Sequence, residues 1–140
     1  MNLARQIEQY LPQQLLELIK TISREANQSG QRAYLVGGIV RDMFLGYSNF
    51  DIDLVIEGDA VKLAQKIAKV SEANLTIHPR FGTAKLSYSN FTLDMTTVRG
   101  ETYAKPGALP TVTPGTINGD LLRRDFSINA MAISLNQSNY

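Results

Sequence analysis

The sequence lacks cysteine, holds a single histidine and carries almost no net charge. The absence of cysteine excludes disulfides and cysteine-ligated zinc, and His78 alone cannot build a multi-histidine metal site. A formal net charge of +1 points to no class of partner. No apolar run approaches the roughly 18 residues that a membrane span needs, and the first residues contain no apolar signal core. We therefore expect a cytoplasmic protein with no membrane partner.

The chain of 140 residues is long enough for one domain with a real core. Hydrophobic periodicity predicts helices over residues 1–28, 39–45, 60–68 and 120–128, and strands over residues 33–36, 51–56, 75–77, 84–88, 91–98 and 130–135. Pro12 suits a first helical turn, Asp59 suits a helix cap, and Ser89-Asn90 suits a β-hairpin turn. Residues 100–118, rich in proline and glycine, predict a long irregular loop. These elements predict an α/β (α+β) fold on one mixed sheet flanked by helices.

The first 30 residues are predicted to form an N-terminal helical extension, and residues 31–140 the main domain. An apolar stripe runs along the extension at helical spacing, formed by Leu15, Leu18, Ile19, Ile22 and Ala26. Such a stripe is either part of the core or an interface with another segment or chain.

Asp51 and Asp53 head an apolar run, Ile52–Ile56, that predicts a buried strand. Because side chains alternate across a strand, the two carboxylates share one face about 7 Å apart. Like charges so placed favour a cation between them, and a divalent metal is the simplest choice. Asp94 interrupts another β-prone segment and is a candidate third carboxylate. The alternative is that these aspartates are ordinary surface residues.

Gly37 and Gly38 form a turn that opens a predicted helix. Backbone amides at such a turn, together with the helix N-terminus, favour a bound phosphate. Arg41 in the first turn can grip that phosphate, and Asp42 either fixes Arg41 or caps the helix. A plain strand-to-helix turn is the alternative. Only thirteen residues separate Gly38 from Asp51, so both features are expected at one end of adjacent strands, where they suggest nucleoside triphosphate chemistry.

Arg123 and Arg124 begin a third notable segment, which continues to Ala130. Neighbouring residues on a helix point about 100° apart, so the two arginines cannot share one task. One can face a triphosphate while the other packs or pairs with an acid, and Phe126 and Ile128 can anchor the segment to the core. A solvated charged face is the alternative.

Three segments, Leu35–Asp42, Asp51–Val55 and Arg123–Ala130, together resemble the head domain of class II tRNA nucleotidyltransferases. This family comprises the CCA-adding enzymes and bacterial poly(A) polymerases, within the DNA polymerase beta nucleotidyltransferase superfamily. The resemblance runs from about Tyr34 to Leu135. It implies a template-independent enzyme that adds C and/or A to the tRNA 3′-end from CTP and ATP.

The resemblance also implies which residues bind the nucleotide. Gly38, with its neighbour Gly37, and Arg41 match phosphate contacts of the family. Arg124 matches a nucleotide-binding arginine, and Asn129 lies in the same motif and supports the site.

The reacting centre is implied in the same way. Asp51 and Asp53 match the Mg²⁺ ligands, and two ions are expected to neutralise the triphosphate. Asp94 matches the carboxylate that helps activate the RNA 3′-hydroxyl, which attacks the α-phosphorus in line while pyrophosphate leaves. Residues 99–116 match a flexible loop that helps select the base.

Family members continue into neck, body and tail regions, and the neck carries a Glu-Asp-x-x-Arg motif that is not found in this sequence. We therefore expect a head that associates with missing neck and body regions or with a partner chain. The alternatives are a poly(A) polymerase, transfer of a nucleotide to a small molecule, and an isolated nucleotide-binding fragment without activity of its own.

Overall fold

The computed structural model describes residues 4–46, 51–89, 91–102, 111–114, 117 and 132–136. The helices are α1 (Ala4–Tyr10), α2 (Gln13–Gln28), α3 (Gly38–Leu45) and α4 (Ala60–Val70), with a 3₁₀ turn at Pro79–Phe81. The strands are β1 (Arg32–Val36), β2 (Asp51–Glu57), β3 (Asn74–His78), β4 (Thr83–Ser87), β5 (Thr92–Thr97), β6 (Arg99–Thr102), β7 (Thr111–Pro114) and β8 (Ala132–Ser134).

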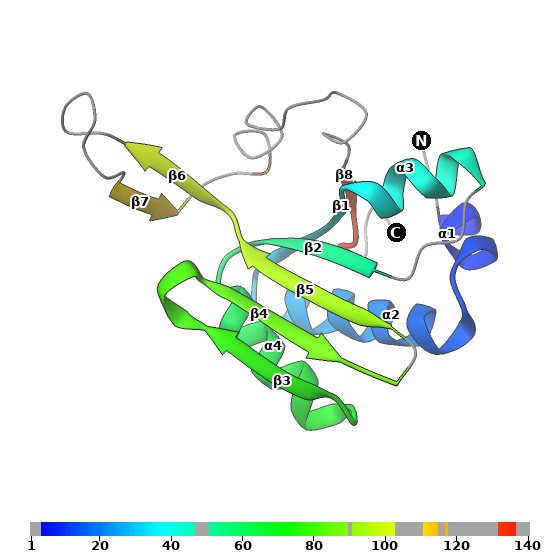
Figure 1. Cartoon of the computed structure of the whole chain (residues 1–140), viewed down its shortest axis with the longest axis horizontal. Coiled ribbons are helices and arrows are strands. Elements are labelled where there is room, and N and C mark those ends of the chain that lie inside the picture. Colours follow the sequence, from blue (N-terminus) through cyan, green and yellow to red (C-terminus); the bar gives the residue numbers. More distant parts are fainter. Residues whose placement is uncertain are drawn as a thin grey trace.

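Six strands form one mixed sheet in the order β3-β4-β5-β2-β1-β8 (Figure 1). β2 and β5 run parallel, and the other neighbours run antiparallel. The predicted α/β fold on a mixed sheet with flanking helices is therefore confirmed. The predicted hairpin is confirmed as β4 and β5, and the predicted last strand as β8.

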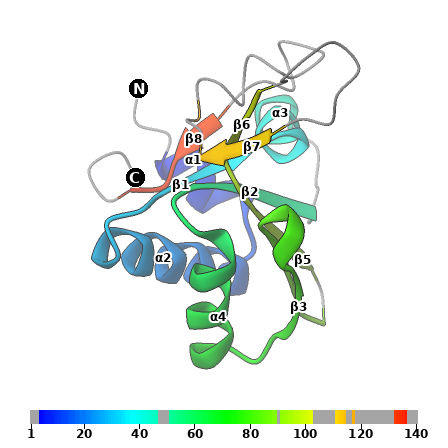
Figure 2. The same ribbon diagram turned by 90° about the vertical axis from the view of Figure 1, so that its left-hand side faces the viewer.

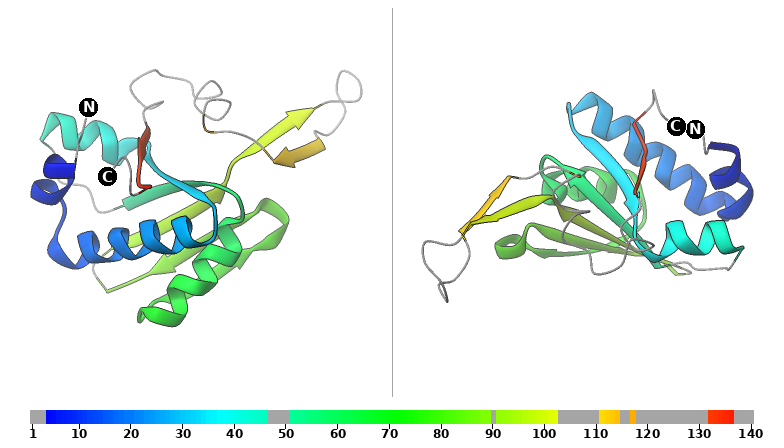
Figure 3. Two further views of the ribbon diagram at one scale, coloured as in Figure 1. Left: turned by 180° about the vertical axis from the view of Figure 1, so that it is seen from behind. Right: turned by 90° about the horizontal axis from the view of Figure 1, so that it is seen from above.

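Helices α2 and α4 cover one face of the sheet and pack against each other (Figure 2). Their buried faces join alternate residues of the strands in one hydrophobic core. On β2 to β5 the core side chains are Ile52, Leu54, Ile56, Ala84, Leu86, Leu93 and Met95, with Leu75 and Ile77 partly buried against them. In the described part of the chain no α-helix covers the opposite face of β3, β4 and β5 (Figure 3). The polar alternate residues of these strands therefore lie on an open face.

The N-terminal helical segment divides into two helices at Leu11-Pro12. Proline lacks a backbone N–H and disfavours helix in the residue before it. As a result, Pro12 precedes α2 as its N-cap rather than lying in the first turn of one continuous helix. The apolar stripe of α2 is core, because Leu15, Ile19 and Ile22 are fully buried. The boundary at residue 30 stays a prediction, since α2 and the sheet share one core.

The prediction of an irregular loop over residues 100–118 is wrong for residues 100–102 and 111–114. Arg99–Thr102 and Thr111–Pro114 pair as the antiparallel ribbon β6-β7, which projects from the end of β5 (Figure 1). β-branched threonine and valine favour the extended form, and a two-stranded ribbon consists only of edge strands, where proline is tolerated. Residues 103–110, and the predicted helix over residues 120–128, lie outside the described residues.

No described helix combines the length and the apolar composition needed to traverse a lipid bilayer.

Candidate active site

The three predicted carboxylates lie on neighbouring strands of the open sheet face. Asp53 on β2 pairs in register with Asp94 on β5, and Asp51 pairs with Thr92 two residues away. Neighbouring strands are about 4.8 Å apart. Asp51 and Asp53 are exposed, and the Asp94 side chain is 44% exposed. The parallel pairing of β2 and β5 thus brings together acids that lie some forty residues apart in the sequence.

Two of these carboxylates have contacts with neighbouring strands. The Thr92 hydroxyl donates to Asp51 Oδ1 at 3.3 Å, and Lys85 Nζ lies 3.7 Å from Asp94 Oδ1. Among the residues that the structure describes, no three His, Cys, Asp or Glu side chains gather so as to hold a metal ion. Asp94 forms an ion pair with Lys85 in this structure. The candidate metal ligands are the pair Asp51 and Asp53.

The glycine turn lies directly beside Asp53. Val36, the last residue of β1, pairs in register with Asp53, and Gly37 follows it at φ 76° and ψ −145° as the N-cap of α3. A Cβ built on Gly37 would lie 3.5 Å from Asp53 Oδ2. The expectation that turn and carboxylates share one end of adjacent strands is confirmed. A positive φ of this kind is rarely adopted by residues with a side chain, so glycine is needed at position 37.

Arg41, in the first turn of α3, donates from Nε to Asp42 Oδ1 at 2.8 Å. Its side chain is 35% exposed, whereas that of Asp42 is 11% exposed. The hydrogen bond to Asp42 and the charge of that carboxylate raise the pKa of Arg41 above its usual value, so the guanidinium stays charged. Of the two roles expected for Asp42, the structure supports fixing Arg41. The guanidinium is thereby held in a fixed orientation at the start of α3.

Several predicted site residues lie outside the described residues. They are Arg123, Arg124 and Asn129, with the neighbouring Phe126 and Ile128, and much of the loop over residues 99–116. Lys85 is a residue near the site that the sequence reasoning missed. Its position on the alternating segment before the hairpin turn could have revealed it, since a hairpin places it opposite Asp94.

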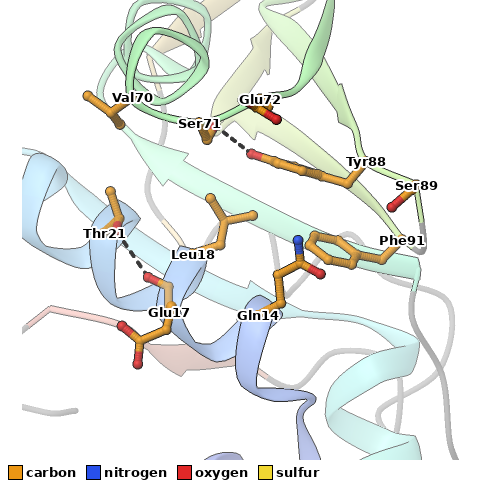
Figure 4. Close-up of a pocket in the computed structure, with 10 residues that line it drawn as sticks. All are labelled: Gln14, Glu17, Leu18, Thr21, Val70, Ser71, Glu72, Tyr88, Ser89 and Phe91. Carbon is orange, nitrogen blue, oxygen red and sulfur yellow. Dashed lines mark hydrogen bonds between the residues drawn. The ribbon is translucent and has the colours of Figure 1, made fainter.

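A cavity of about 530 Å³ lies on the helix-covered side of the molecule (Figure 4). Its lining residues are Gln14, Glu17, Leu18, Thr21, Val70, Ser71, Glu72, Tyr88, Ser89 and Phe91. The Tyr88 ring stacks on Phe91 at 4.8 Å between centroids, and its hydroxyl lies 2.8 Å from Ser71 Oγ. Burial raises the pKa of Tyr88. No predicted site residue lines this cavity, so the candidate site is the open face instead.

Comparison with known proteins gives a consistent result. Residues 33–140 match the poly A polymerase head domain family. The chain is 50% identical over 109 residues to an A-adding tRNA nucleotidyltransferase of Aquifex aeolicus, a match that covers 78% of this chain and 13% of that protein. It is 47% identical over 126 residues to an A-adding tRNA nucleotidyltransferase of Halalkalibacterium halodurans, covering 89% of this chain and 30% of that protein.

A solved tRNA nucleotidyltransferase complexed with a primer tRNA and an incoming ATP analog superposes with a TM-score of 0.72 at 42% identity. That match covers 85% of this chain and 32% of the solved one. The chain thus spans about a third or less of the length of these relatives. Because the family match covers most of the sequence, the chain belongs to the poly A polymerase head domain family.

Proposed function

We propose that this chain is the catalytic head of a nucleotidyltransferase that adds A and/or C to the 3′-end of tRNA. ATP and CTP are the donors, and pyrophosphate is released. The observation that carries the proposal is the position of Asp53, between the glycine turn on β1 and Asp94 on β5. This arrangement brings a phosphate-binding turn and carboxylates to one end of the sheet. It joins the two parts that triphosphate chemistry needs.

We propose Mg²⁺ as the metal, two ions in number, with Asp51 and Asp53 as protein ligands. The residues fit this ion: carboxylate oxygens are hard ligands, and Mg²⁺ usually takes one or two carboxylates with water and substrate phosphates. Both aspartates are exposed on an open face, so water and phosphate have access. When bound, the metal supplies positive charge to the triphosphate and to the oxygens that attack and leave.

The chain's own residues position the reactants. Gly37 and Gly38 present the N-terminus of α3 to the triphosphate, and Arg41, oriented by its hydrogen bond to Asp42, binds a phosphate. Asp94 accepts or directs the proton of the RNA 3′-hydroxyl as that oxygen attacks the α-phosphorus. Positioning and charge then account for most of the rate.

Two further nucleotide contacts are proposed from the sequence. Arg124 binds the incoming nucleotide, and Asn129 supports the site. Arg124→Ala is expected to weaken ATP affinity by about tenfold or more, as loss of a charged hydrogen bond does. Isothermal titration with a non-hydrolysable ATP analogue measures this, and an unchanged affinity removes Arg124 from the site.

Addition of A is favoured over addition of C, because both relatives described above are A-adding enzymes. The test uses labelled ATP or CTP, Mg²⁺ and two tRNAs, one lacking the terminal A and one lacking the whole CCA end. We expect one A on the first tRNA, with little use of CTP on the second. A ladder of C and A additions would instead indicate CCA addition.

A poly(A) polymerase is the second candidate, favoured by the name of the matching family. It predicts long A tails on RNA with any 3′-end. An isolated nucleotide-binding module predicts ATP binding without pyrophosphate release, and a pyrophosphate assay separates it from both enzymes.

Because the relatives are longer, neck and body regions or a partner chain are proposed to complete tRNA binding. We place the protein in the cytoplasm.

A further inference from the structure

A row of register partners crosses five strands of the sheet at the level of Asp53. From one side to the other it contains Val36, Asp53, Asp94, Lys85 and Thr76, on β1, β2, β5, β4 and β3. The glycine turn follows Val36, so under the proposed function the triphosphate lies on the β1 side of the row. On the opposite side of Asp94 stands Lys85, a cation on the open face.

We propose that Lys85 binds the backbone phosphate of the terminal nucleotide of the RNA, on the β3-β4 side of Asp94. This inference rests on the proposed function and names the subsite of its second substrate. In an in-line displacement the attacking oxygen and the leaving group lie on opposite sides of the phosphorus. With the leaving phosphates at the glycine turn, the RNA end must approach from the side of β4 and β3.

The contacts of Lys85 suit an exchange of partners. Its ammonium lies 3.7 Å from Asp94 Oδ1, and both side chains are nearly half exposed, 47% for Lys85 and 44% for Asp94. An exposed ion pair of this kind contributes little to stability, so it can be broken at small cost. A lysine ammonium has three donors on a flexible stem. It can therefore move to a phosphate while Asp94 turns to the RNA 3′-hydroxyl.

The surface beyond Lys85 also suits RNA. Asn74, Thr76 and His78 on β3 are exposed, while Leu75 and Ile77 between them pack against the core. An amide, a hydroxyl and an imidazole thus line the open face next to Lys85. These groups hydrogen-bond to phosphate and ribose oxygens without selecting a base. The surface is therefore suited to hold an RNA end regardless of its sequence.

The test compares Lys85→Ala, Lys85→Arg and the wild-type chain with Lys69→Ala as a matched control. Lys69 is an exposed lysine on α4, on the helix-covered side of the sheet. Its replacement removes the same charge as Lys85→Ala, but far from the open face. The substrates are fluorescein-labelled tRNA lacking its terminal A, and ATP with Mg²⁺. KM for each substrate, kcat, and tRNA binding by anisotropy without ATP are measured at several salt concentrations.

We expect Lys85→Ala to raise KM and Kd for tRNA about tenfold, as loss of a charged hydrogen bond does. KM for ATP should stay within about twofold, and the salt slope of tRNA binding should shrink by about 0.7 to 1. Lys85→Arg and Lys69→Ala should resemble the wild type.

Three results would overturn the inference: unchanged tRNA binding in Lys85→Ala, a rise in KM for ATP instead of tRNA, or no tRNA binding by the wild-type chain. A fall in kcat with both KM values unchanged would also contradict it, since Lys85 would then act on Asp94 alone. The anisotropy measurement tests the Lys85 proposal separately from the proposed function. If the wild-type chain binds tRNA but transfers no nucleotide, the proposed function is wrong, while the effect of Lys85→Ala on the Kd for tRNA still tests the role of Lys85.

Discussion

Replacement of Gly37 by alanine tests the connection between the backbone of the glycine turn and the carboxylate beside it. Gly37 holds φ 76° and ψ −145°, a conformation that is almost restricted to glycine. The new Cβ would lie 3.5 Å from Asp53 Oδ2, which is ordinary van der Waals contact. The loss of stability is therefore expected to come from backbone strain and not from steric crowding. A residue with a side chain that is forced into such a conformation lowers the free energy of unfolding by about 1 to 3 kcal/mol.

For a chain of this length a loss of about 2 kcal/mol lowers Tm by roughly 6 °C. Because relief of the strain would shift the start of α3 and Asp53 together, we expect activity to fall about a hundredfold, as a displacement of about 1 Å can cause. The assays are thermal unfolding by circular dichroism and transfer of labelled ATP.

Gly46→Ala is the matched control. Gly46 ends α3 at φ 75° and ψ 18°, and a Cβ there would meet nothing within 4 Å. It should lose about 1 kcal/mol of stability and keep its activity. If Gly37→Ala matches the wild type in stability, or matches Gly46→Ala in both measurements, the backbone of Gly37 does not position Asp53.

Three further changes test the fold. Asp59→Ala removes the carboxylate that accepts from the backbone N–H of Lys62 at 3.1 Å, and should lower stability by about 1 kcal/mol in urea unfolding; no change would mean that the cap is dispensable. Ile19→Ala opens a cavity under α2 and should lower stability by about 2 to 5 kcal/mol; a loss below about 1 kcal/mol would indicate that α2 is a separate extension. Burial raises the pKa of Tyr88, so stability that is present below its ordinary pKa of about 10 is lost as pH rises through the raised value. Tyr88→Phe should be less sensitive to alkaline pH in urea unfolding, and equal sensitivity would contradict this.

Local patterns were sufficient to predict most elements of the fold. The β-prone segment around Asp94 predicted the strand that the structure shows as β5. The αL residue Gly46 ended α3 where expected. The N-cap at Asp59 was also predicted, because a capping side chain acts within one helical turn.

What the sequence did not reveal depends on contacts between distant segments. The order β4-β5-β2, which puts Lys85, Asp94 and Asp53 in one row, follows from a parallel pairing that no local pattern specifies. The ribbon β6-β7 was missed because its strands are short and lie beside prolines and glycines. Helix periodicity also continued across Pro12, although proline separates α1 from α2 there.

The central claim is that Asp53 serves nucleotide transfer rather than folding. Asp53→Asn keeps the shape of the side chain and removes its charge, and Glu72→Gln removes an exposed charge elsewhere as the control. Loss of a metal ligand should raise the activation free energy by several kcal/mol. Because about 1.4 kcal/mol corresponds to a tenfold change in rate, the transfer rate should fall at least about a hundredfold.

The decisive measurement is the rate at which each variant adds labelled A to tRNA lacking its terminal A, with Tm measured in parallel. We predict that Asp53→Asn loses transfer while its Tm stays close to that of the wild type and of Glu72→Gln. Transfer by Asp53→Asn at the wild-type rate would show that Asp53 has no part in nucleotide transfer.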